Sequence, residues 1–204
     1  MKVPQSQAII EKDDILSIIV SAENSEIAKP FNLPAISIEQ GNTIVGAQRN
    51  QAYLVDSDGK VELPKIGAIE ITGLTRIQAQ NKIKELLKVY INNPIVTLRI
   101  LNFRITVLGD VSNPGTFTVP NENINIIEAI GLAGDMTITG DREKVMVIRE
   151  TEEGKQITGV LDFTKSDLFR SPFYNLKQND IVVVDPNYYK VQRSVANPNT
   201  GIFV

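Results

Sequence analysis

Runs of apolar, β-branched residues predict most of the regular structure of this chain. Residues 15–20 follow a polar turn and consist almost entirely of isoleucine, leucine and valine, which is typical of a strand. In 95–100 and 104–108, apolar residues occupy every second position, as in strands with one face against a core. Similar runs predict further strands at 145–149, 157–161 and 181–184.

Two segments carry the pattern of a capped amphipathic helix. Thr75 is followed three residues later by Gln78, and Asn125 is followed three residues later by Glu128. Each pair predicts a capping box, in which the two side chains satisfy free backbone N–H groups at the helix start. Gly134 is placed to end the second helix, since glycine readily adopts the left-handed conformation found after a last turn.

The stretch DSDG at 56–59 predicts a tight turn between two short apolar runs. Asp58 favours a turn, and Gly59 can supply the positive φ that closes it, so a hairpin over 52–63 is expected. Pro64 would end the second strand of this hairpin, and Gly67 would begin another.

The sequence Asn113-Pro114-Gly115 fits a type II turn, with proline at the second position and glycine at the third. This fit predicts a positive φ at Gly115 and strain in a variant with valine there. By contrast, residues 21–51 are polar and interrupted by proline and glycine, so they are predicted to be loop with one short strand near 36–38.

The predicted elements form two strand–helix–strand blocks, one ending near Ile100 and one running from about Asn102 to Pro186. This order predicts the α+β class, with each capped helix packed on its own sheet. The two blocks share one short sequence pattern, found at 10–15 and at 176–181. In each, an apolar residue is followed by a polar turn, then an aspartate, Asp14 or Asp180, and then the start of a strand.

Composition excludes several classes of function. The 204 residues carry a formal net charge of −3, with 24 acidic and 21 basic residues, so a basic face for nucleic acid is not expected. Histidine and cysteine are absent, which excludes thiol nucleophiles, Ser–His pairs and zinc sites of the Cys/His type. We therefore expect no enzyme activity, cofactor or metal. Because neither a signal peptide nor a membrane span is visible, the chain is either cytosolic or trimmed of its signal and anchors.

Two candidate chemistries remain open at this stage. Asp13 and Asp14 could form a pair of acid/base carboxylates, although adjacent acidic residues more commonly cap a turn. Tyr188 and Tyr189 could stack on sugar rings or cover the end of a sheet. No residue is assigned to sugar contact from these patterns.

The ordered motifs of the first block resemble the polysaccharide export sequence domain of outer-membrane polysaccharide export proteins. These motifs are KDDILSIIV at 12–20, YLVDSDG at 53–59, LPKIG at 63–67, GLT at 73–75 and NPIV at 93–96. The second block resembles a soluble-ligand-binding β-grasp domain through VLGDV at 107–111, NPGTF at 113–117, IEAIGLAG at 127–134 and NDIVVV at 179–184. Asp13, Asp135 and Asn179 depart from glycines usual in the family, but Asp and Asn also tolerate left-handed turn geometry.

The resemblance implies a domain division at 1–101, 102–186 and 187–204, the last being a linker towards a C-terminal membrane segment. It assigns structural roles, with no catalytic, cofactor or metal residue among them. The residues concerned are Asp14, Asp58, Gly59, Pro64, Gly67, Thr75, Asn113, Pro114, Gly115, Gly134 and Asp180.

For function, the resemblance implies a ring-forming conduit that exports capsular polysaccharide or exopolysaccharide at the periplasmic face of the outer membrane of a Gram-negative bacterium. Its implied partners are further copies of itself, the polysaccharide chain, an inner-membrane polysaccharide co-polymerase and the outer membrane, through a lipid and a helix outside this sequence. Two alternatives stay open: a free-standing β-grasp module that binds a soluble sugar, and an enzyme that uses two carboxylates on sugar polymer.

Overall fold

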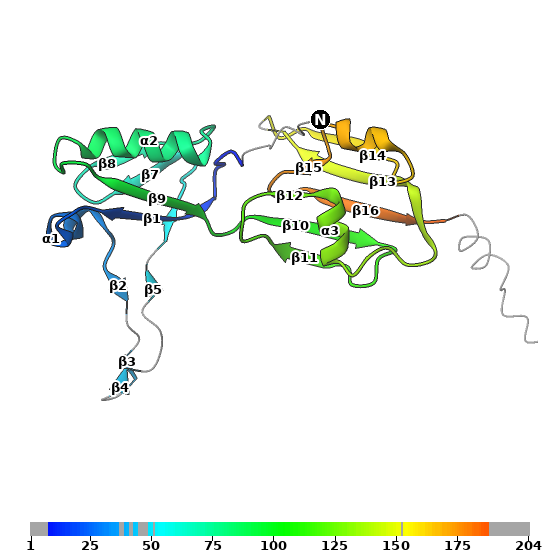
Figure 1. Ribbon diagram of the computed structural model, residues 1–204, viewed down its shortest axis with the longest axis horizontal. Helices are drawn as coiled ribbons and strands as arrows, with labels where there is room; N and C mark the ends of the chain where they lie inside the picture. The colour runs from blue at the N-terminus through cyan, green and yellow to red at the C-terminus, as the bar shows by residue number, and fades with distance from the viewer. Residues whose placement is uncertain are drawn as a thin grey trace, which may run out of the picture. The chain divides into compact units, whose positions relative to one another are not determined.

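The computed structural model describes residues 8–36, 39–40, 43–44, 49–50, 52–151 and 153–187. The chain divides into two compact units. The N-terminal unit spans Gln7–Asn102, and the C-terminal unit holds the residues from Phe103 onward. Both combine small sheets with short helices, which confirms the predicted α+β class (Figure 1). Tyr188, Tyr189 and the predicted linker beyond them lie outside the described residues.

The N-terminal unit is built on an antiparallel sheet of three strands in the order β6-β1-β9. Helix α2 packs against β9, and its buried face is Ala79, Ile83 and Leu87. A separate hairpin of β7 and β8 lies beside α2 (Figure 1). The bounds are β1 Ile15–Ser21, β6 Tyr53–Leu54, β7 Lys60–Leu63, β8 Gly67–Glu70, α2 Arg76–Leu87 and β9 Ile95–Ile100.

Between β1 and β6 the chain forms a short helix and a hairpin. Asn24 caps the helix by accepting a hydrogen bond from the Glu26 N–H at 3.0 Å. This helix contradicts the prediction of mostly loop in 21–51, and Asn24, its N-cap, is the local signal that the prediction overlooked. The bounds are α1 Ser25–Ala28, η1 Lys29–Phe31, β2 Ala35–Ile36, β3 Glu39–Gln40, β4 Thr43–Ile44 and β5 Arg49–Asn50.

The predicted hairpin over 52–63 is wrong in its pairing, although its turn is present. Gly59 has φ 78° and its N–H donates to the Asp56 carbonyl at 2.9 Å. However, β6 pairs with β1, and β7 pairs with β8 through the turn that begins at Pro64. The turn therefore changes the direction of the chain between two sheets instead of joining neighbouring strands.

The C-terminal unit contains a five-stranded sheet in the order β11-β10-β16-β13-β14. Strands β10 and β16 run parallel, and the other neighbours run antiparallel. Ile126, Ala129 and Ile130 form the buried face of α3, which packs on the side of β10 (Figure 1). The bounds are β10 Arg104–Gly109, β11 Gly115–Thr118, β12 Ile124–Asn125, α3 Ile126–Leu132, β13 Gly140–Glu150, β14 Gln156–Leu161, η2 Ser166–Arg170, β15 Asn175–Leu176 and β16 Ile181–Pro186.

The prediction of a positive φ at Gly115 is wrong. Gly115 does not have a positive φ, and it begins β11 opposite Val107, so its backbone is extended. The connection is held instead by Asn113, whose N–H donates to the Ala133 carbonyl at 2.8 Å. The glycine with a demanding conformation in this region is Gly109, which has φ 91° at the end of β10.

Both predicted capping boxes form. At α2, the Gln78 N–H donates to Thr75 Oγ1 at 3.3 Å, and the Thr75 N–H donates to Gln78 Oε1 at 2.8 Å. At α3, Asn125 and Glu128 make the equivalent exchange. Because each box uses only residues within one turn, sequence spacing alone was enough to predict it.

Replacing Thr75 with alanine is expected to lower the free energy of unfolding of the N-terminal unit by about 1 kcal/mol, the usual cost of losing a helix cap. Urea unfolding followed by circular dichroism measures the change. Thr75→Ser keeps the hydroxyl and serves as the matched control, so it should remain close to the parent. Equal losses in both variants would show that the threonine methyl group, and not the cap, carries the effect.

Candidate functional site

The short pattern shared by residues 10–15 and 176–181 forms the same type of turn in both units. In the N-terminal unit, the buried Asp14 carboxylate accepts a hydrogen bond from the Glu11 N–H at 2.9 Å. The Asp13 N–H donates to the Val55 carbonyl at 3.0 Å, and the Val55 N–H donates to the Asp14 carbonyl at 2.9 Å. The turn thus closes on itself and is joined to the segment after β6 by a pair of backbone bonds.

In the C-terminal unit, Asp180 has the same role. Its carboxylate accepts from the Lys177 N–H at 2.8 Å, and the Asn179 N–H donates to the Arg104 carbonyl at 2.8 Å. The Thr106 N–H donates to the Asp180 carbonyl at 3.0 Å. Each turn therefore fixes the start of the central strand of its sheet, β1 or β16.

The three departures from the family's glycines all adopt left-handed backbone conformations. Asp13 has φ 65°, Asn179 has φ 61° and Asp135 has φ 71°. This confirms the expectation that Asp and Asn would keep the turn geometry at these positions. Asp13 is exposed while Asp14 is buried, so the two carboxylates do not share one environment.

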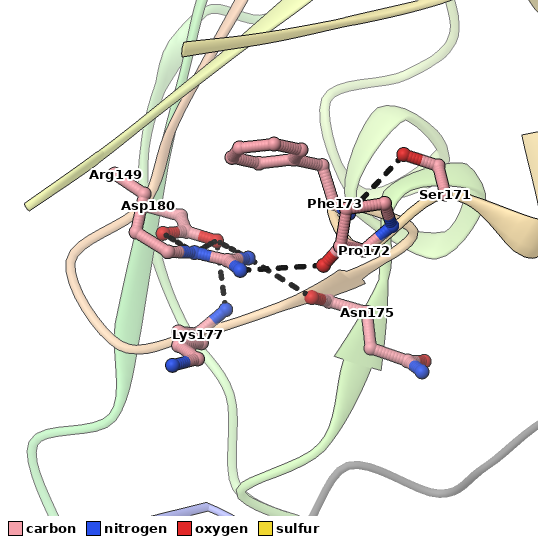
Figure 2. Close-up of polar contacts among 7 residues, drawn as sticks. All are labelled: Arg149, Ser171, Pro172, Phe173, Asn175, Lys177 and Asp180. Carbon is pink, nitrogen blue, oxygen red and sulfur yellow. Dashed lines mark hydrogen bonds and ion pairs between the residues drawn. The ribbon is translucent and has the colours of Figure 1, made fainter. Parts of the chain in front are cut away.

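The C-terminal turn is also the centre of a buried polar cluster (Figure 2). Arg149 Nη2 lies 2.6 Å from Asp180 Oδ2, and Arg149 Nε donates to Asp180 Oδ1 at 2.9 Å. The same guanidinium donates to the Asn175 carbonyl at 3.0 Å and to the Pro172 carbonyl at 3.3 Å. The side chain of Arg149 is 9% exposed and that of Asp180 is 0% exposed. The cluster therefore joins β13 to the turn before β16, to the first residue of β15 and to Pro172 in the segment before β15.

An aromatic side chain covers this cluster. The Arg149 guanidinium carbon lies 5.0 Å from the centre of the Phe173 ring, within the range of a cation–π contact (Figure 2). The same ring lies over Gly159, where an added Cβ would fall 2.1 Å from a ring carbon. Glycine at this position of β14 is thus required by the close approach of the ring.

Sequence reasoning identified Asp180 but missed Arg149, its counter-charge. A local signal for Arg149 was present, since Val145 and Val147 are buried and share its face of β13. A charged residue in a row of inward positions indicates a buried partner, because an unpaired charge in a core is costly. Nothing in the sequence spacing indicates which acid, 31 residues away, is that partner.

The remaining glycines named from the sequence lie in turns. Gly67 has φ 88° in the turn after Pro64, and Gly134 has φ 76° at the end of α3. The Gly134 N–H donates to the Gly131 carbonyl and the Asp135 N–H donates to the Ile130 carbonyl, both at 3.0 Å. This pair of bonds is the Schellman motif, so Gly134 ends the helix as predicted.

Asp58 is held by a contact within its own turn, whereas Asn113 lies against the end of α3. The Asp58 N–H donates to Asp56 Oδ1 at 2.9 Å, so Asp56 supplies the carboxylate that holds this turn. The Asn113 side-chain nitrogen lies 2.7 Å from where a Cβ on Gly134 would fall, which adds a steric reason for glycine there. Pro114 lies between Asn113 and the start of β11.

Three groups, at two places in the chain, have shifted pKa values. Hydrogen bonds from Lys165 and Thr164 lower the pKa of the half-buried Asp162 to about 2, and the bond to Asp162 raises the pKa of Lys165. Burial raises the pKa of Tyr53.

One shallow pocket of about 200 Å³ lies in the N-terminal unit, which is small compared with typical ligand sites. Its lining residues are Ala22, Glu23, Asn24, Ile27, Ile91 and Asn92. Within the described ranges, no three acidic side chains gather as a metal site would require. No helix in the described stretches is both long and apolar enough to cross a membrane.

Comparison with known proteins assigns each unit to a described domain. Residues 2–101 match the family described as polysaccharide biosynthesis/export protein, and residues 104–160 match the SLBB domain. The chain therefore has the export domain followed by the SLBB domain, as the sequence motifs indicated. It belongs to the family of polysaccharide biosynthesis/export proteins.

Two curated relatives share one name, EPS I polysaccharide export outer membrane protein EpsA. The protein from Ralstonia solanacearum is 29% identical over 178 residues, which cover 85% of this chain and 46% of the relative. The protein from Ralstonia nicotianae is 31% identical over 150 residues, which cover 71% of this chain and 38% of the relative. The chain spans less than half the length of either relative.

Proposed function

We propose that this chain is part of an outer-membrane translocon that exports capsular polysaccharide or exopolysaccharide, and that it acts as a structural conduit without enzyme activity. The proposal includes a place at the periplasmic face of the outer membrane, contact with the exported polymer and an inner-membrane co-polymerase as a partner. The observation that carries it is the order of the two domains, the export domain and then the SLBB domain.

The chemistry of the described residues is compatible with this role. The best-developed polar site, around Arg149 and Asp180, is buried and directed inward, so it stabilises the fold. Asp13 and Asp14 lie in a turn, and the Asp14 carboxylate accepts a hydrogen bond from the Glu11 N–H. The alternative, a free-standing module that binds a soluble sugar, would require a pocket for that sugar in the C-terminal unit.

The conduit is proposed to be a ring of copies of the full-length protein. Contacts in a closed ring join one face of a subunit to a different face of the next. Anchoring in a membrane raises the effective concentration of the subunits, so that weak single contacts suffice. We therefore expect this 204-residue chain alone to be monomeric or weakly associated in light scattering, and full-length protein in detergent to form the ring.

Deleting the gene in the bacterium that encodes this chain is expected to abolish polysaccharide at the cell surface and in the medium, while polymer accumulates inside. Complementation with the parent or with Arg142→Met, an exposed site, should restore export; Arg149→Met should not, because it removes a buried charge partner. Undiminished export in the deletion strain would contradict the transport role. Shortening of purified polymer by the protein, abolished by Asp13→Asn or Asp14→Asn, would instead indicate an enzyme.

A further inference from the structure

The five-stranded sheet of the C-terminal unit ends in two strands that each have one partner among the described residues. Strand β11 pairs with β10, and β14 pairs with β13. The sequences of these edge strands are GTFT and QITGVL, and neither contains a charge or a proline. Exposed edges in natural proteins usually carry such residues, because an unprotected edge pairs with other chains. Val160 on β14 is 67% exposed, which makes this edge apolar as well.

The hydrogen bonds at the strand ends show which backbone groups face outward. The Val119 N–H bonds the Phe103 carbonyl beside β11, and the Thr151 N–H bonds the Lys155 carbonyl at the turn before β14. Bonded pairs alternate with non-bonded pairs along an antiparallel ladder. In the observed registers, these bonds fix which residues of each edge strand face outward. On β11 the outward N–H and carbonyl groups belong to Thr116 and Thr118. On β14 they belong to Gln156, Thr158 and Val160.

The two edges are also in register with each other across the sheet. Thr158 lies opposite Ile148, Ile148 opposite Ile181, Ile181 opposite Thr106, and Thr106 opposite Thr116. Thr116 and Thr158 are thus the two ends of one row, with their side chains exposed on the same face. A neighbouring copy placed beside this sheet without a shift along the strands would bring Thr116 opposite Thr158.

Strand direction permits this contact. Along the row, β11 runs opposite to β10, β16 runs parallel to β10, β13 runs opposite to β16 and β14 runs opposite to β13. Strand β14 therefore runs opposite to β11. When a second copy continues the sheet in the same orientation, the edge β11 of one copy meets the edge β14 of the next as an antiparallel pair.

We infer that β11 of one copy pairs antiparallel with β14 of the next, with Thr116 opposite Thr158, so that the sheet continues from subunit to subunit. The inference rests on the ring proposed above and names the surface that forms it. The partner is a second copy, since the two edges of one sheet complement each other in direction, register and lack of charge. The contact joins two different surfaces, which is the type that closes into rings.

Disulfide trapping tests this pairing on the chain itself, because it contains no cysteine. Thr116→Cys and Thr158→Cys chains of different size are mixed under mild oxidation. Directly bonded antiparallel pairs have Cα atoms about 5.5 Å apart, which a disulfide can span. The mixture should give several times more mixed dimer than either variant gives of its own dimer, and the double variant should give a ladder of higher oligomers. Ser166→Cys, at an exposed position on η2, replaces Thr158→Cys in the control mixture and should give little mixed dimer.

Equal yields in the test and control mixtures, or faster dimerisation of Thr158→Cys with itself, would overturn the inference. In full-length protein, Thr158→Pro should weaken the ring, because it removes an outward N–H while leaving the bonds to β13. Thr158→Val keeps that N–H and should leave the ring intact. A ring that forms normally with proline at 158 would refute the edge contact alone, whereas a full-length parent that never forms a ring would refute the proposed conduit.

Discussion

Replacing Arg149 with methionine is expected to lower the free energy of unfolding of the C-terminal unit by about 3–5 kcal/mol, the range found when one partner of a buried ion pair is removed. Asp180 would remain in a site where its side chain is fully buried, without the guanidinium that bonds both of its oxygens. The Asn175 and Pro172 carbonyls would lose a donor as well. Urea unfolding followed by circular dichroism measures the change.

Arg142 on the same strand provides the matched control. Its side chain is 51% exposed and lies 3.7 Å from Asp135, so Arg142→Met should change stability by less than about 1 kcal/mol. Combining Arg149→Met with Asp180→Asn should cost less than the sum of the two single changes, because the residues share one interaction. Strict additivity in this cycle, or equal losses at Arg149 and Arg142, would show that the buried pair does not carry the stability.

Gly109→Ala is expected to destabilise the C-terminal unit by roughly 3 kcal/mol or more, since left-handed strain and a steric clash act together. Gly109 has φ 91°, and an added Cβ would lie 2.0 Å from the Val184 carbonyl oxygen. That carbonyl also accepts the Asp110 N–H at 2.8 Å, so β16 cannot move away without breaking a bond of the sheet. Thermal unfolding and the yield of soluble protein measure the effect.

Gly115→Ala is the control for this prediction. Gly115 lies in extended backbone, with nothing within 4 Å of an added Cβ. Alanine should therefore be neutral or slightly stabilising there, by up to about 1 kcal/mol, because it restricts the unfolded chain. A Gly109→Ala protein that melts together with Gly115→Ala would show that the backbone at 109 adjusts freely.

Features that depend on neighbouring residues could be predicted from the sequence. The capping boxes at Thr75 and Asn125 and the end of α3 at Gly134 each involve contacts within a few residues. Spacing determines such contacts directly, and the structure agrees with it.

Features that depend on distant partners could not be predicted in the same way. Strand β6 is next to β7 in sequence but pairs with β1, and the motif at Asn113 is held by the end of α3 and not by its own turn. The ion pair between Arg149 and Asp180 joins β13 to the start of β16 across a long loop. Each of these depends on how the sheet is ordered, which the local pattern does not contain.

The central position of β16 has a consequence for how the C-terminal unit is made. Strand β16 lies between β10 and β13 and is the last strand of this sheet in the sequence. A growing chain therefore cannot join the β11-β10 pair to the β13-β14 pair until residues 181–186 have been synthesised. Pairing across such sequence distances is slow, and exposed strand edges in the meantime favour aggregation. A chain that stops before Ile181 would thus lack the central strand of the sheet. Its two hairpins would stay separate, and we expect the cell's proteases to degrade it.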